Sequence, residues 1–245
     1  MPNGKHPHGC VRSARHSGVI LGLLLLSAGA LGQDLVSVAP QAAKIEYEDA
    51  RFRIVRLKIA PDETLPMHDR PYRVIIPLTP GDAKLTLPDG RTSISRTQAG
   101  HVTFSGPGKR SVTNVGVPIE NVLIEFKNID APGKPLSAPP DPKPANYLDD
   151  PFHHWLLENQ YVRIYDARVP PGETTTFHLH ALDTIRVVLS GQPISTQIEG
   201  KEWSPSSMAA SGSSLYTADS AKPYKHRLRN DGKGEYHVII VQLLQ

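Results

Sequence analysis

Residues 170–180 read Pro-Pro-Gly-Glu-Thr-Thr-Thr-Phe-His-Leu-His, and this stretch decides the fold more than any other. Its Pro-Gly pair suits the central positions of a type II turn. In an extended strand, side chains at i and i+2 point to the same face, so His178 and His180 are expected to face the same way. Residues 185–191, Ile-Arg-Val-Val-Leu-Ser-Gly, form a second β-branched run that closes on a glycine turn signal. The segment therefore predicts a turn, two successive strands and another turn.

A third histidine, His226, lies far along the chain and is followed by Asn230. If a distant strand brings His226 beside the pair, three imidazoles can surround one metal ion. The His-x-His spacing alone is weak evidence, since the chain has 11 histidines in 245 residues and the same spacing occurs near the N-terminus. The surrounding sequence must therefore supply the specificity.

An internal repeat supplies part of it. Residues 48–68 align without a gap with residues 158–178, an offset of 110, and seven of the 21 positions are identical, including His68 with His178. Further on, residues 100–104 correspond to 212–216, and Arg110-x3-Asn114-x-Gly116 corresponds to His226-x3-Asn230-x-Gly232. The chain thus reads as two copies of one β domain.

The second copy resembles the cupin family. Residues 172–191 resemble its first motif, G-x5-H-x-H-x3,4-E-x6-G, and residues 226–230 resemble the H-x3-N ending of its second. The resemblance implies an all-β fold of two cupin (double-stranded β-helix, or jelly-roll) domains in tandem, a bicupin. The chain departs from the pattern in two places. Thr184, preceded by Asp183, stands where the family usually has a glutamate ligand, and residues 220–225 lack the Pro-x-Gly of the second motif.

In the first copy the metal ligands are largely replaced. His68 remains, but its partners correspond to Arg70 and Arg110, and a guanidinium cannot ligate a cation. Two interpretations stay open for this degenerate cupin domain. It is a structural half alone, or Arg70, Arg73 and Arg110 form a pocket that binds a carboxylate or phosphate.

Residues 1–32 have the pattern of a signal peptide: Lys5, Arg12 and Arg15 precede a short apolar run that ends in small residues. The run is shorter than a membrane-spanning helix requires, so cleavage and a periplasmic or secreted location are expected, with an uncleaved anchor as the alternative. Cys10, the chain's one cysteine, lies in this leader, which excludes disulfides and thiolate catalysis after it. The leader also carries the whole formal net charge of +3, so the remainder gives no indication of a nucleic-acid partner.

Four segments are expected: the signal peptide at 1–32, a degenerate cupin domain at 33–127, a proline-rich linker at 128–150, and a metal-binding cupin domain at 151–245. Residues 45–60 alternate apolar and charged side chains as a strand does, with one phase slip near Val55 that predicts a bulge. Residues 153–157, His-His-Trp-Leu-Leu, suggest a short helix. The two adjacent histidines point in different directions in either structure, so they are interpreted as surface or packing residues.

The candidate ligands are His178, His180 and His226, with Fe(II) as the favoured divalent ion and Mn, Ni or Zn as alternatives. Asp183 could orient a ligand imidazole or act as a fourth ligand. Tyr216 and Arg186 are candidate pocket residues, although core packing is the favoured role for each.

The leading functional hypothesis is an exported small-molecule dioxygenase or related oxidoreductase. A non-catalytic metal- or ligand-binding cupin is the second hypothesis, and an isomerase or decarboxylase is the last, because no glutamate is placed to act as acid or base. The expected partner is a small, anionic substrate drawn to the ion. The resemblance also implies a homodimer, but two domains in one chain can satisfy the same contacts internally.

Overall fold

The computed structural model describes residues 33–139 and 150–244. Within the first range a short helix, α1 (Leu35–Val38), precedes nine strands. These strands are β1 (Ala43–Glu48), β2 (Phe52–Ile59), β3 (Thr64–Arg70), β4 (Arg73–Pro77), β5 (Gly81–Thr86), β6 (Thr92–Thr97), β7 (Thr103–Ser105), β8 (Gly108–Asn114) and β9 (Ile119–Phe126).

The second range repeats this arrangement with a single-turn 3-10 helix, η1 (Asp219–Ala221), near the metal-ligand candidates. Its strands are β10 (His153–Glu158), β11 (Val162–Val169), β12 (His178–His180), β13 (Thr184–Ser190), β14 (Pro193–Ile198), β15 (Ser207–Met208), β16 (Ser214–Thr217), β17 (Tyr224–Asn230) and β18 (Tyr236–Leu243).

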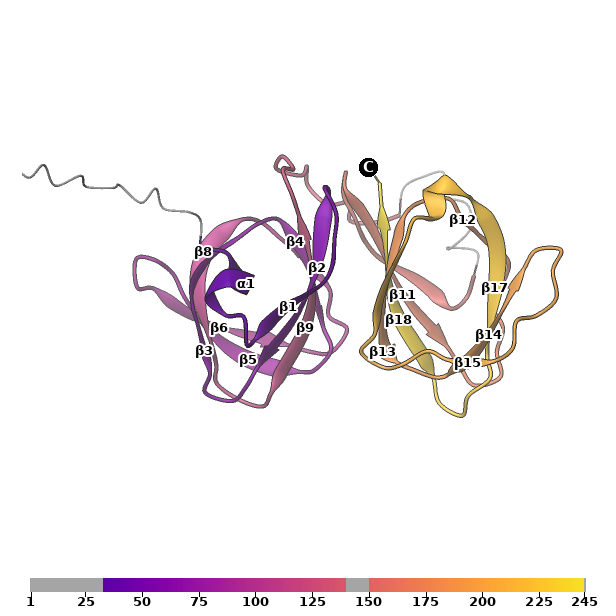
Figure 1. The fold of residues 1–245 in the computed structure, drawn as a ribbon, viewed down its shortest axis with the longest axis horizontal. Helices are drawn as coiled ribbons and strands as arrows, with labels where there is room; N and C mark the ends of the chain where they lie inside the picture. The colour runs from indigo at the N-terminus through magenta and orange to yellow at the C-terminus, as the bar shows by residue number, and fades with distance from the viewer. Residues whose placement is uncertain (1–32, 140–149, 245) are drawn as a thin grey trace, which may run out of the picture. The chain divides into compact units, whose positions relative to one another are not determined.

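Each half closes into a barrel of two antiparallel sheets (Figure 1). The five-stranded sheets have the orders β1-β2-β9-β4-β7 and β10-β11-β18-β13-β16, and the four-stranded sheets have the orders β3-β8-β5-β6 and β12-β17-β14-β15. The strand order is the same in both halves. The all-β fold of two jelly-roll barrels predicted from the sequence is therefore confirmed.

The repeat extends to the hydrogen-bond register. In the first half Ile45 pairs with Val55 and Tyr47 with Ile54, so β1 carries one extra residue. Residues 155, 157, 164 and 165 pair in the same way, with the same irregularity, at an offset of 110. The expected bulge near Val55 is real, but the extra residue lies on the opposite strand.

The predicted short helix at residues 153–157 is wrong, because this segment forms β10. It pairs with β11 from His153 opposite Ala167 to Glu158 opposite Arg163, and its burial alternates along the strand. Strand pairing across the sheet thus overrides local helix propensity. Residues 128–139 of the expected linker contain no helix or strand, and the rest of the linker, like the expected leader, lies outside the described residues apart from Asp150.

One apolar core joins the two five-stranded sheets, which belong to the same compact unit of the chain. Phe52, Ile54 and Ile124 of the first half pack in this core with Ile185 and Ile239 of the second. Its side chains are fully or almost fully buried. Sheet faces packed in this way are stabilised by removal of apolar surface from water.

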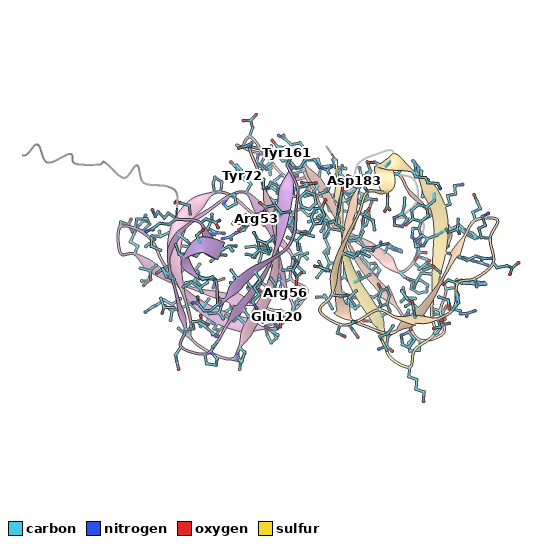
Figure 2. All side chains as sticks on the ribbon, viewed as in Figure 1. Arg53, Arg56, Tyr72, Glu120, Tyr161 and Asp183 are labelled. Carbon is cyan, nitrogen blue, oxygen red and sulfur yellow. The ribbon has the colours of Figure 1, made fainter. Side chains whose placement is uncertain are left out.

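Polar contacts border the shared core. Arg56 Nη2 donates to the carbonyl oxygen of Gly212 at 2.6 Å, and Ser214 Oγ donates to Glu46 Oε2 at 2.5 Å. Arg56 also pairs with Glu120 on its own barrel at 3.3 Å (Figure 2). These bonds add directional contacts to an otherwise apolar surface.

The interior of the first barrel contains the short helix α1, which lies inside the ring of strands (Figure 1). Leu35 of this helix is 1% exposed and packs against Leu57, Leu65 and Leu123. Asp34 caps this helix by accepting hydrogen bonds from the backbone N–H groups of residues 36 and 37. The helix thereby contributes Leu35 to the apolar interior of that barrel.

None of the helices in the described ranges has the length and apolarity needed to cross a membrane.

Candidate metal centre

Two neighbouring strands of the second barrel position the three histidines. β12 carries His178 and His180 on one face, with both side chains buried and Leu179 between them turned away. β17 lies antiparallel to β12, and its His226 pairs directly with His178. The strand alternation expected from the sequence therefore directs all three imidazoles into the barrel.

The three rings converge. Their candidate ligand nitrogens all lie within 4.8 Å of one another, and the ring centroids are 4.5 to 5.2 Å apart. We call His178, His180 and His226 the His cluster. Asp183 is not part of this group of convergent donors.

Hydrogen bonds fix the orientation of two of the rings. His178 Nδ1 lies 3.0 Å from the carbonyl oxygen of Thr176, and His180 Nδ1 lies 3.0 Å from Asp219 Oδ2. A carbonyl and a carboxylate accept hydrogen bonds, so each Nδ1 carries the proton and each Nε2 keeps its lone pair. This is the tautomer that a metal-ligating imidazole needs.

Burial keeps the His cluster uncharged. Burial lowers the pKa of His178 to about 4, that of His180 to about 3 and that of His226 to about 2. Repulsion from Arg186, and from a neighbouring imidazole once that ring is protonated, adds to the effect. Neutral imidazoles at pH 7 have lone pairs available for a cation. The donor set therefore fits a divalent metal ion, with three nitrogen ligands on one side and open positions on the other.

A cavity of about 520 Å³ lies against the His cluster. Its walls are mostly apolar, with Val188, Ile194 and Val238 among them, while Arg186 supplies a positive charge. The volume is within the range of small-molecule sites. Arg186 is therefore a cavity residue, as the sequence suggested.

His153 also lines this cavity, which excludes the surface interpretation and leaves that of a packing residue. It is 6% exposed, its ring centroid lies 5.0 Å from that of His178, and its Nδ1 lies 3.2 Å from Asp150. It is not among the convergent donors. The neighbouring His154 is exposed, as strand alternation in β10 requires.

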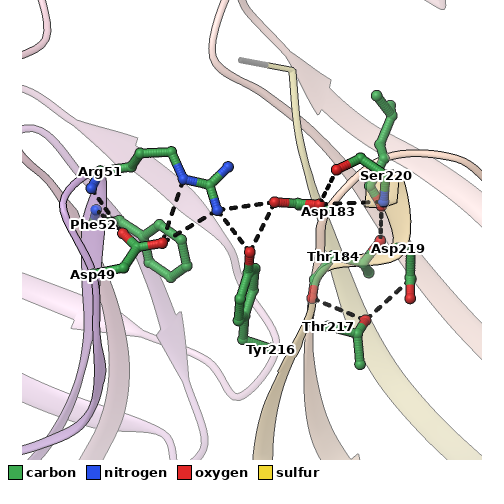
Figure 3. A network of polar contacts seen from close by, with 10 residues as sticks. Asp49, Arg51, Phe52, Asp183, Thr184, Tyr216, Thr217, Asp219 and Ser220 are labelled. Atoms are coloured by element: carbon green, nitrogen blue, oxygen red, sulfur yellow. Dashed lines mark hydrogen bonds and ion pairs between the residues drawn. The ribbon is translucent and has the colours of Figure 1, made fainter. Parts of the chain in front are cut away.

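Asp183 lies between the two barrels (Figure 3). Its carboxylate accepts hydrogen bonds from Ser220 N at 3.2 Å, from Ser220 Oγ at 2.5 Å and from Tyr216 OH at 2.8 Å, and it pairs with Arg51 of the first barrel at 2.9 Å. Burial alone would raise the pKa of Asp183, but these hydrogen bonds outweigh it and lower the pKa to about 2. Asp183 therefore connects η1, through Ser220, to the first barrel, through Arg51.

Asp219 occupies the role that the sequence suggested for Asp183. It is 6% exposed, accepts from Thr217 Oγ1 at 3.0 Å and orients His180. Tyr216, expected in the pocket, is instead part of the interbarrel network: its ring packs on Tyr47 and Phe52, and Arg51 Nη2 donates to its hydroxyl at 2.6 Å.

Asn230, the last residue of the H-x3-N pattern, stabilises the turn behind the site. Its Nδ2 donates to the carbonyl oxygens of Val169 and Gly234, both at 2.8 Å, and its Oδ1 accepts from Gly232 N at 2.9 Å. Asn114 makes the equivalent bonds in the first barrel, where no His cluster exists. The asparagine is thus a structural residue of the barrel.

The arginines of the first barrel separate into two places. Arg73 and Arg110 line a small cavity with His68, whereas Arg70 lines a different hollow and donates from Nη2 to Ser105 Oγ at 2.8 Å. The three-arginine fork considered from the sequence is therefore wrong for Arg70, because β3 turns its side chain toward Ser105.

Comparisons with known proteins agree with this geometry at the level of fold. No family model and no curated protein matches the chain. Among solved structures the chain is similar to AerE from Microcystis aeruginosa, with a TM-score of 0.55 and 13% identity over 83% of this chain and 98% of that one.

Two further similar structures are enzymes. An oxalate decarboxylase from Lactobacillus farciminis, in a formate complex, has a TM-score of 0.53 and 10% identity over 82% of this chain and 83% of that one. A mutant salicylate 1,2-dioxygenase from Pseudoaminobacter salicylatoxidans, bound to gentisate, has a TM-score of 0.51 and 11% identity over 78% and 68%. At these identities the likeness shows the fold, that of cupin barrels, here two in tandem.

Proposed function

We propose that the second barrel is the metal centre of an oxidoreductase of the dioxygenase type, in which the His cluster holds Fe(II) and a small anionic molecule binds in the adjoining cavity. The observation that carries the proposal is the convergence of three neutral, buried imidazoles at a cavity of about 520 Å³. When bound, an Fe(II) ion with open coordination positions would supply the activation of dioxygen.

The protein's own residues would bind and orient the substrate. The guanidinium of Arg186 is the positive side chain on the cavity, so it would attract an anionic head group toward the His cluster. The apolar walls formed by Val188, Ile194 and Val238 would cover a hydrophobic body and exclude water from it. We therefore expect a substrate with an apolar part and one carboxylate, or an ionisable hydroxyl, beside the metal.

The residues that line the cavity favour an oxidoreductase over an isomerase or decarboxylase. They include no aspartate or glutamate among the described residues, so no carboxyl group is in place to transfer a proton to the substrate. The same feature favours the second candidate function, a protein that holds a metal or small ligand without catalysis. The dioxygenase in the comparisons supports the first candidate and the fold alone supports either.

The experiment begins with the metal. Protein purified from its native compartment, or loaded anaerobically with Fe, Mn, Ni or Zn, should retain one equivalent per chain, and His226→Ala should lose it. His154→Ala is the matched control, because His154 lies on the exposed face of β10. Failure of every metal to bind would contradict the proposal at its base.

Catalysis is tested separately. Fe(II)-loaded protein should consume oxygen with at least one member of a panel of thiols, catechols, flavonols and diketones, and Arg186→Gln should raise the KM for anionic members more than it changes kcat. Tight metal retention without oxygen consumption would favour the binding protein instead.

We also infer export, which is supported by the pattern of residues 1–32 alone. Mass spectrometry of the protein recovered from the periplasm or medium should find a chain shortened by about that segment.

A further inference from the structure

The first barrel contains a second, smaller cavity, at the position that corresponds to the His cluster. His68 on β3 pairs directly with Arg110 on β8, as His178 pairs with His226 in the second barrel. Both residues line a cavity of about 90 Å³, together with Arg73 and Asn121. The repeat has therefore kept a pocket here while changing its chemistry.

The walls of this cavity are apolar apart from that polar end. Leu35 of α1, Leu65, Ile119 and Leu123 form much of the lining, and each is at most 5% exposed. A volume of about 90 Å³ suits only a molecule of a few heavy atoms. An apolar lining with arginines among it fits a short apolar chain that carries one anionic group.

The polar end carries a positive charge that is not fully compensated. Arg73, 4% exposed, pairs with Glu125 at 2.9 Å, and Glu125 also pairs with Arg53 at 2.6 Å. Arg53 in turn pairs with Asp34, so these four charges balance and the remaining charge is that of Arg110. Arg110 has no carboxylate partner among the described residues, and the Nε atoms of both Arg73 and Arg110 are buried without an acceptor. A half-buried cation without a carboxylate partner and two buried N–H donors without acceptors are costly, so an anion placed there would be stabilised.

Cations are excluded by the same residues. Burial, followed by the charge of Arg73, lowers the pKa of Arg110 to about 10, so Arg110 still carries its proton at pH 7. His68 Nδ1 lies 2.8 Å from the carbonyl oxygen of Pro66, and burial lowers the pKa of His68, so its imidazole is neutral. With the proton on Nδ1, Nε2 of His68 carries the lone pair, and the ring lines the small cavity.

We propose that the first barrel binds a short-chain monocarboxylate, with the carboxylate held by the guanidinium groups of Arg73 and Arg110 and the alkyl part packed against Leu35, Leu65 and Ile119. Charge-assisted hydrogen bonds from guanidinium to carboxylate are among the strongest in proteins. Asn121 Oδ1, which also lacks a partner, lines the same cavity. The site is separate from the metal centre and does not depend on it.

The test uses the metal-free full chain, dialysed against chloride buffer at pH 7. Isothermal titration with formate, acetate, propionate and butyrate at constant ionic strength should show one saturable site per chain for at least one of them. Sulfate, which is too large and too polar for the apolar end, should bind more weakly. If none of the four carboxylates binds, water alone fills the cavity and the proposal is wrong.

Variants locate the site. Arg110→Gln should weaken carboxylate binding by about tenfold or more, the loss expected when a charge-assisted hydrogen bond is removed. The matched control is Arg96→Gln on β6 of the same sheet, which removes the same charge from a side chain that is 76% exposed. Arg186→Gln, in the second barrel, should leave binding unchanged. If Arg186→Gln abolishes binding and Arg110→Gln does not, the carboxylate binds at the metal centre and the proposal is wrong.

Thermal unfolding distinguishes loss of the carboxylate site from misfolding of the variant. Acetate or propionate should raise the Tm of the native chain and leave that of Arg110→Gln unchanged. Without carboxylate, Arg110→Gln should be as stable as the native chain or more stable, because it removes a half-buried charge that has no carboxylate partner. Arg110→Lys keeps the charge without the planar guanidinium and should bind with intermediate affinity. Equal carboxylate affinity in all three chains would refute the role of Arg110.

Discussion

Removal of the Asp219 carboxylate tests whether the His cluster is built to hold a metal. Asp219 accepts a hydrogen bond from His180 Nδ1 at 3.0 Å. It is 6% exposed, so water does not readily take its place when the carboxylate is removed. Asp219→Ala leaves all three imidazoles in place but frees His180 to rotate or to change tautomer. Loss of such a carboxylate costs about 10- to 100-fold in metal affinity, which corresponds to about 1.4 to 2.7 kcal/mol.

The assay is competition for Zn or Fe(II) with a chelator of known affinity, at pH 7. Asp219→Asn, which retains an acceptor oxygen, should recover part of the loss. Asp166→Ala is the matched control: Asp166 also pairs with a histidine of the same barrel, His237, at 2.6 Å, but neither residue belongs to the His cluster. Equal metal affinity in the native chain and in Asp219→Ala would refute the reasoning, since it would mean that the orientation of His180 does not matter for metal binding.

Three further predictions concern stability. Asn230→Ala should lower the free energy of unfolding by about 2 to 4 kcal/mol in urea titration, because three buried hydrogen bonds are lost, and a change below about 0.5 kcal/mol would show that water replaces them. Asp183→Ala should lower the free energy of unfolding more than Arg51→Ala, because the Asp183 side chain is 9% exposed and binds three partners, whereas the Arg51 side chain is 42% exposed. Arg51→Ala should cost about 1 kcal/mol or less. The reverse order would contradict the role given to Asp183 in the interbarrel network. Folding lowers the pKa values of the three histidines of the His cluster from 6.5 to between about 2 and about 4. Between pH 6.5 and pH 4 the unfolded chain therefore binds more protons than the folded chain. The metal-free protein should be most stable above pH 6.5 and should lose stability as the pH falls toward 4. Replacement of the three histidines by glutamine should flatten that part of the pH profile, as measured by urea titrations from pH 7 to pH 4.5.

The fold could be predicted because its signals are local or repeated. Strand alternation placed His178 and His180 on one face, and the offset of 110 residues held for strand pairing as well as for identities. The same offset places residues 153–158 on residues 43–48, so extension of the repeat by five residues would have identified β10 as a strand. The apolar Trp-Leu-Leu run gave the opposite indication because short runs do not distinguish helix from strand.

The partners of the site residues could not be predicted, because they come from tertiary contacts. Asp183 and Asp219 are both acidic and both follow a strand of the second barrel, and only the folded chain shows which of them meets His180. Asp150 and His153 reach the cavity region from β10 and the turn before it, where the sequence has no distinguishing motif. In the first barrel, the insertion of α1, which leaves room only for a small molecule, depends on the position of Leu35 inside the ring of strands.

The apolar surface that joins the two barrels has a consequence for how the halves can change. In an assembly of two identical chains, every substitution appears twice and must suit both places. Here Phe52 and Ile185 meet across the interface as different residues on one polypeptide, so each half can accept substitutions that the other never carries. Covalent linkage thereby removes the symmetry that would otherwise tie the arginine-lined half to the histidine-lined one, and the two interiors are free to differ in charge.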